Sequence, residues 1–401
     1  MRIGLLGYDR QLLDVVEAAR RRGDAAVIGC DLPATPPAAL AGLRRADSWE
    51  ALLDPAACDL VLVGRDGWNA TRAEAVRTLV QAGRTLLLAQ PLELSMLWAY
   101  ELDMMRRDTG ARLVPLLTAR LHPFVERLRT IVEHGIAGGG TLGSLESITM
   151  VRRLADRNRD AVLARLAVDA DLVRVLVGEP ARLATLGAAD PDTAWSTLAV
   201  GFSGPGFVPT RWQVAPGDEP AVSITLQHAR GTIQVEAPDD PARPWTWSGP
   251  PAESLAGDGP ARLLDRLAAP AAGDGVPMAG WADAARAIEL AETVPRSLAK
   301  GRAIDLHREE FSEIGTFRGT MASLGCGLVL AGLVVLVLAT LVGGIAHEFD
   351  WELGRRVAAA WPVLVLVVLG AFLALQLLPL VIDADGGRSG GPRPGDGPDR
   401  T

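Results

Sequence analysis

The sequence predicts an α/β protein in three parts: an N-terminal Rossmann-like, doubly wound parallel sheet, a C-terminal α+β domain with a mostly antiparallel sheet, and then two transmembrane helices. Short apolar runs alternate with helical patterns up to about residue 120, which is typical of a parallel sheet covered by helices on both faces. Longer strand-like runs follow with few helices between them, which favours antiparallel pairing. Residues 319–346 and 357–382 carry no charged side chain, and each run is long enough to span a bilayer.

The N-terminal part, residues 1–120, is predicted to be a dinucleotide-binding type of domain. Residues 2–7 form a short apolar run that ends in glycine, and residues 11–22 then place apolar side chains at helical spacing. The same patterns predict further strands at 25–30, 60–63, 85–88 and 112–117, and helices at 69–82 and 95–109.

The second part, residues 121–310, is predicted to be an α+β domain. Its strands are predicted at 145–152, 194–202, 212–214, 221–228 and 232–236, with a helix at 161–177. The stretch 241–276 is rich in Pro, Gly and Ala and is predicted to be loop around a short helix near Leu263. A last helix is predicted from one apolar stripe formed by Trp281, Ile288, Ala291, Val294 and Leu298.

Charge and cysteine content exclude several classes of function. A net charge of -8 and a pI near 5.3 argue against binding to nucleic acid, which needs a surplus of Lys and Arg on one face. The cysteines Cys30, Cys58 and Cys326 are odd in number and widely spaced, so they fit neither a disulfide framework nor a zinc site. No metal site is predicted.

The two charge-free runs predict a membrane hairpin, so that the chain would be a two-pass integral membrane protein. A pair of buried core helices is the alternative, which the short polar loop between the runs disfavours. The N-terminus lacks the apolar stretch of a signal peptide, and basic residues precede the first run, so the soluble part is predicted to be cytoplasmic. Residues 383–401 are rich in Gly, Pro, Asp and Arg and are predicted to be a disordered tail.

Several stretches resemble the Gfo/Idh/MocA family, the relatives of glucose-fructose oxidoreductase and inositol dehydrogenase, over about three quarters of the chain. Residues 82–92 match the family stretch that usually reads Gly-Lys-His-Val-x-x-Glu-Lys-Pro, and Arg120-Leu-His122-Pro123 is similar to its Arg-Phe-x-Pro turn. Likeness extends to 46–55, 58–63, 169–180 and 297–301. The resemblance implies an oxidoreductase that uses NAD or NADP on a sugar or cyclitol.

The cofactor turn that the resemblance implies is degenerate. A dinucleotide site usually has Gly-x-Gly-x-x-Gly after the first strand, so that bare backbone can approach the pyrophosphate. Here only Gly7 is present, Asp9 would place a negative charge beside the diphosphate, and Arg10 would offset part of it. Asp31, after the second strand, stands where an acid would bind a ribose hydroxyl, although a surface-loop Asp explains it equally well.

The catalytic positions that the resemblance implies have also changed. The family's Lys is replaced by Gln90, which together with Pro91 also belongs to the degenerate cofactor-binding positions that the resemblance implies. The family's His on the substrate-domain helix is replaced by Val168. Neither side chain exchanges a proton near neutral pH. A frame shift of one or two residues is the alternative explanation. The matching positions that remain as candidates for chemistry are Asp171, Arg120, His122 and Gln90 itself.

Two main functions follow from these observations. The preferred hypothesis is a catalytically silent relative that holds no certain cofactor and acts as a ligand sensor or an interaction scaffold. The alternative is an active NAD(P)-dependent oxidoreductase on a sugar, cyclitol or lipid-linked glycan at the cytoplasmic membrane face. The expected partners are a sugar-like small molecule, the lipid bilayer and a second copy of the chain, and no nucleic acid. Trp245 and Trp247 are either walls of a sugar cleft or plain packing.

Overall fold

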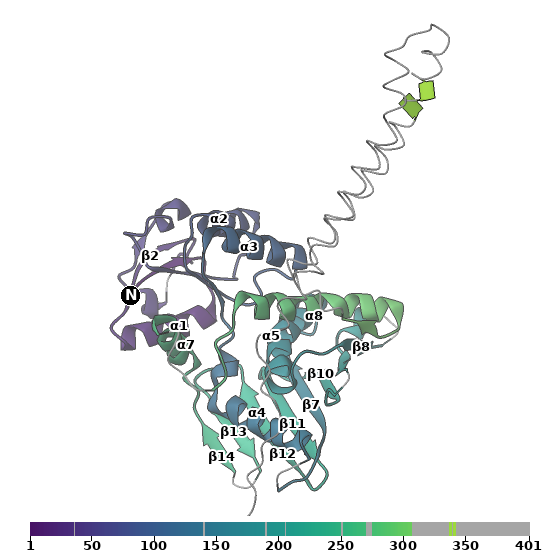
Figure 1. The fold of residues 1–401 in the computed structure, drawn as a ribbon. Coiled ribbons are helices and arrows are strands. Elements are labelled where there is room, and N and C mark those ends of the chain that lie inside the picture. The colour runs from purple at the N-terminus through teal and green to yellow at the C-terminus, as the bar shows by residue number, and fades with distance from the viewer. Residues whose placement is uncertain are drawn as a thin grey trace, which may run out of the picture. The chain divides into compact units, whose positions relative to one another are not determined.

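The computed structural model describes residues 1–306, apart from 36, 139–140, 189–190, 205, 250–251 and 270–274, and also residues 337–338 and 340–341 (Figure 1). Met1–His307 form one compact unit. No helix in the described ranges is long and apolar enough to cross a bilayer. Apart from those four residues, the predicted spans at 319–346 and 357–382 and the predicted tail at 383–401 lie outside the described residues.

The first sheet confirms the predicted parallel, doubly wound arrangement. Its strand order is β3-β2-β1-β4-β5-β6, all parallel. The strands are β1 (Arg2–Leu6), β2 (Ala25–Cys30), β3 (Arg44–Arg45), β4 (Leu60–Val63), β5 (Leu86–Leu88) and β6 (Leu113–Pro115). The helices α1 (Arg10–Arg21), α2 (Ala70–Gln81) and α3 (Met96–Thr109) alternate with them. The order reverses between β1 and β4, where this type of sheet opens a crevice at its carboxyl edge.

Apolar runs fold into this sheet because both of its faces are covered. All four residues of β4 are buried, and the two faces contribute to different clusters: Val61 and Val63 pack on one side, Leu60 and Leu62 on the other. Near the sheet also lie the short helices η1 (Ala38–Leu40) and η2 (Trp49–Leu52).

The second sheet has the order β14-β13-β12-β11-β7-β10-β9-β8-β15 and is antiparallel except for the parallel pair β7 and β10. Its strands are β7 (Leu145–Leu154), β8 (Arg182–Leu186), β9 (Ala199–Ser203), β10 (Thr210–Pro216), β11 (Ala221–His228), β12 (Gly231–Pro238), β13 (Trp245–Ser248), β14 (Glu253–Leu255) and β15 (Ile304–Asp305). The helices of this part are η3 (Thr118–Leu121), α4 (Pro123–Ile136), α5 (Arg159–Val177), α6 (Pro191–Ala194), α7 (Gly259–Ala268) and α8 (Trp281–Lys300). Side chains of α4, α5 and α8 share one core with the sheet.

Two local predictions in this part were wrong. Residues 241–276 were expected to be loop around one helix, but β13 and β14 form there as well, because Trp247 packs against Phe124 and beneath the guanidinium of Arg127. The strand expected from residue 194 begins only at Ala199, since Ala194 ends α6. The division of the chain at residue 120 stays a prediction, because both sheets lie within the one compact unit.

Helix α8 joins the two sheets. Its first residue, Trp281, makes an edge-to-face contact with Trp98 of α3. Trp281 Nε1 also donates a hydrogen bond to the Ala99 carbonyl oxygen over 2.9 Å. Its other side packs on α5, and Figure 1 shows the long green helix between α3 and α5. The two halves are therefore held together by buried aromatic contacts.

Candidate functional site

The turn after β1 is the place where a dinucleotide-binding fold would receive the pyrophosphate. Gly7 has a φ of 76°, and its amide donates to the Cys30 carbonyl oxygen over 2.9 Å. Asp9 follows as the N-cap of α1, with its Oδ1 accepting the Gln11 amide over 2.8 Å. Asp9 is only 3% exposed, and this burial raises the pKa of its carboxyl above the ordinary value. The N-terminus of α1 is thus already capped by a carboxyl of the chain itself.

A buried arginine fills the space beside this turn. Arg72, at the start of α2, is 5% exposed and donates from Nε and Nη2 to Asp31 Oδ2, the former over 2.9 Å. Its Nη1 donates to the carbonyl oxygens of Gly64 and Asp66 over 3.1 Å and 2.6 Å. A Cβ added to Gly7 would lie 2.6 Å from the guanidinium carbon. Arg72 therefore spans the carboxyl ends of β2, β1 and β4.

The backbone closes the same crevice. The loops after β1 and β4 form an isolated antiparallel bridge between Tyr8 and Asp66, in which the Asp66 amide donates to the Tyr8 carbonyl oxygen over 2.9 Å. A Cβ on Gly64 would meet the Tyr8 backbone at 2.4 Å. A dinucleotide across this turn would meet the Asp9 carboxyl, this bridge and the Arg72–Asp31 pair. The residues at the turn do not fit such a cofactor.

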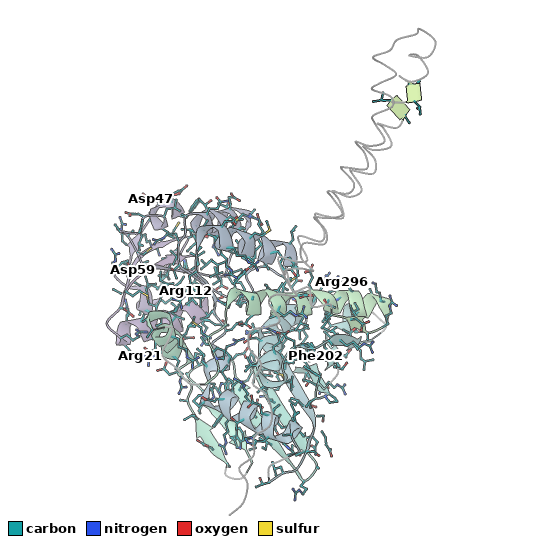
Figure 2. All side chains as sticks on the ribbon, in the orientation of Figure 1. Arg21, Asp47, Asp59, Arg112, Phe202 and Arg296 are labelled. Atoms are coloured by element: carbon teal, nitrogen blue, oxygen red, sulfur yellow. The ribbon has the colours of Figure 1, made fainter. Side chains whose placement is uncertain are left out.

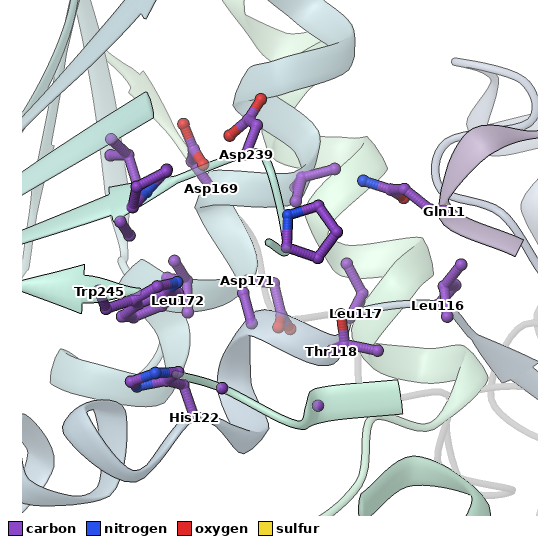
Figure 3. A pocket seen from close by; sticks show the side chains of 18 of the residues that line it. Gln11, Leu116, Leu117, Thr118, His122, Asp169, Asp171, Leu172, Asp239 and Trp245 are labelled. Carbon is purple, nitrogen blue, oxygen red and sulfur yellow. The ribbon is translucent and has the colours of Figure 1, made fainter. Parts of the chain in front are cut away.

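A first pocket of about 140 Å³, here called the inner pocket, is lined by α5, by the second sheet, by residues 116–119 and by Gln11 of α1 (Figure 3). Among the residues that line it are His122, Asp171, Trp245, Thr118 and Gln11. The structure thus brings together two of the predicted candidates, His122 and Asp171. Val168, at the position of the family's His, also lines the inner pocket.

A second pocket of about 450 Å³, here called the outer pocket, adjoins the inner one. The two pockets share Gln11, Arg165, Pro238, Asp239, Pro241 and Arg243. It includes the predicted Asp9 and Arg10. Its acidic side chains outnumber its four arginines; they are Asp9, Asp14, Asp66, Asp218, Glu219, Asp239 and Asp240. Burial, helped by the nearby Glu17 carboxylate, raises the pKa of Asp14 to about 6. Acidic side chains therefore predominate in the outer pocket.

The remaining predicted residues lie apart from these two pockets. Gln90 is buried, and its peptide bond to Pro91 is cis, but neither residue lines the inner or the outer pocket. The guanidinium of Arg72 packs against Gly7 and donates hydrogen bonds to Asp31.

Arg120 and Asp171 form a buried ion pair. Arg120 Nε donates to Asp171 Oδ2 over 2.9 Å, Nη2 donates to Oδ1, and the residues are 3% and 1% exposed. Nη1 reaches Asp283 Oδ2 of α8 over 3.4 Å, and Arg174 binds Glu179 and Asp283. A carboxylate held by a bidentate guanidinium joins η3, α5 and α8. Burial raises the pKa of Asp171, and the hydrogen bonds and charge of Arg120 oppose only part of that shift.

The sequence did not predict a second buried network, which is made of hydrogen bonds around Asp169. Asp169 is fully buried and accepts hydrogen bonds from Arg152 Nε over 2.8 Å, from Arg152 Nη2 and from Trp212 Nε1 over 2.8 Å. Arg152 also donates to Asp239 at the rim of both pockets. The strand pattern carried a signal, because Met150, Arg152 and Leu154 alternate toward the core along β7.

His122 serves as the N-cap of α4. Its Nδ1 accepts the Phe124 amide over 3.1 Å, its Nε2 lies 3.3 Å from the Leu255 carbonyl oxygen, and its ring stacks on Trp245 with 4.0 Å between centroids. Since Nδ1 accepts, the ring is neutral with the proton on Nε2. Burial, with some help from Arg262, lowers the pKa of His122 to about 4. His122 is therefore poorly placed to exchange protons with a ligand near neutral pH.

This lowered pKa predicts a pH dependence of stability. Between about pH 6.5 and pH 4 the unfolded chain binds a proton at His122 that the folded chain does not, so the stability contributed by neutral His122 is lost as the pH falls through this window. The variant His122→Asn retains a capping side chain and lacks this titration. We expect the wild type to lose stability relative to the variant between about pH 7 and about pH 4.5, as measured by denaturant unfolding. A stability difference independent of pH would contradict the assignment.

Comparison with known proteins identifies the fold. No protein-family model and no curated protein matches the sequence. Among solved structures, WlbA dehydrogenase from Bordetella pertussis, in complex with NADH and UDP-GlcNAcA, is 19% identical with a TM-score of 0.57, covering 77% of this chain and 99% of that one. UDP-N-acetylglucosamine 3-dehydrogenase GnnA from Acidithiobacillus ferrooxidans is 18% identical with a TM-score of 0.56, covering 74% and 99%. An oxidoreductase from Agrobacterium radiobacter, in complex with NAD+, L-tartaric acid and magnesium, is 16% identical with a TM-score of 0.57, covering 76% and 98%. The chain has the fold of the NAD-dependent dehydrogenases of Gfo/Idh/MocA type.

Proposed function

We propose that this chain is a membrane-anchored, catalytically silent relative of these dehydrogenases, which binds a sugar-like ligand and acts as a sensor or interaction scaffold at the cytoplasmic membrane face. The observation that carries the proposal is the Arg72–Asp31 pair against Gly7. It fills the turn where a pyrophosphate and a ribose would need bare backbone and a free acid. A protein that cannot seat the hydride carrier does not transfer hydride.

The proton-transfer positions support the same proposal. Gln90 and Val168 stand where the resemblance places a Lys and a His, and neither titrates. His122 is a neutral helix cap, and Asp171 is held by Arg120. Gln90 and Val168 cannot take a proton from a hydroxyl group, His122 is neutral near pH 7, and both carboxylate oxygens of Asp171 already accept hydrogen bonds from Arg120.

The inner pocket supports a small, polar ligand. Trp245 lines one side, and Figure 3 shows it above His122, across the pocket from Gln11. Thr118, Gln11 and Asp239 offer hydrogen-bond donors and acceptors around it. An aromatic wall with a few converging polar groups suits a sugar ring, and about 140 Å³ favours one ring over a sugar nucleotide.

The alternative function is an active NAD(P)-dependent oxidoreductase on a sugar, cyclitol or lipid-linked glycan. It is favoured by the solved structures, since WlbA carries NADH on the same fold. In that case Asp171, Arg120 and His122 would be the residues to replace first.

A titration with dinucleotide separates the two proposals. We expect the purified full chain to show no saturable binding of NADH or NADPH up to about 1 mM, which corresponds to a binding free energy weaker than about -4 kcal/mol. WlbA titrated in the same buffer serves as the positive control. A dissociation constant in the micromolar range would rule out the silent protein and favour the enzyme.

Membrane anchoring is proposed from the charge-free runs at 319–346 and 357–382. A two-pass anchor with both ends in the cytoplasm would hold the compact unit next to the inner leaflet. The proposed partners are the bilayer and a second copy of the chain. The acidic balance of the sequence disfavours nucleic acid.

A further inference from the structure

Helix α3 carries an apolar stripe on its outer side. Leu97, Tyr100 and Met104 are 82%, 41% and 67% exposed, and their spacing of three and four residues places them along one line of the helix. The other side of α3, with Trp98 and Leu102, is buried in the core beside the first sheet. A group of large exposed apolar side chains at this spacing indicates a surface that contacts something other than water.

The stripe lies next to the end of the compact unit. The Met96 amide of α3 donates to Glu292 Oε2 of α8 over 3.1 Å. Arg296, which Figure 2 labels, and Lys300 follow Glu292 at intervals of four residues on α8. Both are exposed, as is Arg302 just beyond the helix. A basic group therefore leads from the apolar stripe toward Leu306, in a chain whose net charge is -8.

The sequence limits how far this surface can be from a bilayer. Residues 307–318 connect Leu306 to the first charge-free run, and fully extended they span at most about 43 Å. This step rests on the membrane anchor of the proposed function. With that anchor in place, the end of the compact unit stays within this distance of the lipid headgroups.

We infer that the α3 stripe and the basic end of α8 together form a docking surface for an anionic bilayer. Leu97, Tyr100 and Met104 would enter the headgroup region, where large apolar and amphipathic side chains are accommodated. Arg296 and Lys300 would lie near the anionic lipid headgroups, which concentrate on the cytoplasmic leaflet. The occupant is lipid and not a second copy, because the apolar and basic groups adjoin near the end that continues toward the proposed anchor.

Site-specific quenching tests this docking. The full chain, with Cys30 and Cys326 replaced by alanine and buried Cys58 retained, is labelled with a dye at Leu97→Cys and inserted into nanodiscs that carry a lipid-borne quencher. The matched control is Ala229→Cys in the turn between β11 and β12. The opposite end of these two strands, at Pro220 and Pro238, lines the outer pocket together with Asp9, so the turn lies at the end of the strands away from the first sheet. We expect quenching at position 97 to exceed that at 229 by about twofold or more in discs with phosphatidylserine, and to fall in discs of phosphatidylcholine alone.

Two variants and one extraction complete the test. Met104→Ser, and separately Arg296→Glu with Lys300→Glu, should each reduce the quenching at position 97 without changing that at 229. Equal quenching at the two positions overturns the docking, and so does quenching at 97 that appears only when two chains share a disc, which would indicate a second copy. Release of the wild-type chain from membranes by alkaline carbonate overturns the anchor and the docking with it. Retention without quenching at 97 overturns the docking alone.

Discussion

Replacing Asp169 by alanine is expected to lower the free energy of unfolding by about 3–5 kcal/mol, the range for breaking a buried ion pair from one side. The variant leaves Arg152 buried with Asp239 as its remaining carboxylate partner, and it leaves Trp212 Nε1 without its acceptor. Burial alone would lower the pKa of Arg152, but Asp169 and Asp239 raise it, so the charge persists in the folded chain. Chemical denaturation of the full chain, followed by tryptophan fluorescence, measures the loss.

The matched control for Asp169 is an acid in an exposed pair. Asp305 binds Arg182 over 2.6 Å, but their side chains are 61% and 59% exposed. Solvent and salt screen such a pair, so Asp305→Ala should lower the stability much less than Asp169→Ala. A loss at Asp169 as small as that at Asp305 would show that the Arg152 network is not a structural element of the second half.

The strands that the sequence predicted best have a paired strand on both sides. The bounds of β2, β4 and β11 agree with the predicted ranges, because uninterrupted apolar or alternating runs have only one way to be covered. Short edge strands such as β3 and β15 were not predicted. Two-residue strands carry no periodic pattern, and their pairing depends on neighbours distant in the chain.

The candidate site was harder to predict because its charges are paired over long distances in sequence. Asp31 was interpreted as a ribose-binding acid or as a surface residue, and the structure gives it a third role as the partner of Arg72, 41 positions away. Asp171 and Arg120 were each noted as candidates for chemistry, but only the fold shows that they bind each other. The sequence alone does not show whether an arginine and an aspartate contact a ligand or each other.

Removing Arg72 is expected to destabilise the chain without restoring a cofactor site. Arg72→Ala eliminates the hydrogen bonds to Asp31, Gly64 and Asp66, and we expect it to lower the free energy of unfolding by about 2–4 kcal/mol, less than at Asp169 because the Asp31 side chain is 52% exposed. The matched control is Arg10→Ala at the same turn, whose side chain is 80% exposed and should contribute less than about 0.5 kcal/mol.

The dinucleotide affinity of Arg72→Ala decides what this arginine does. The Asp9 carboxyl and the Tyr8–Asp66 bridge remain in the variant, so a diphosphate would still meet a buried acid and a closed backbone. We therefore expect no saturable binding of NADH up to about 1 mM, as in the wild type. Micromolar binding by the variant alone would make Arg72 a removable gate over a working cofactor site. In that case NADH binds in spite of the Asp9 carboxyl, and an active oxidoreductase becomes the better supported function.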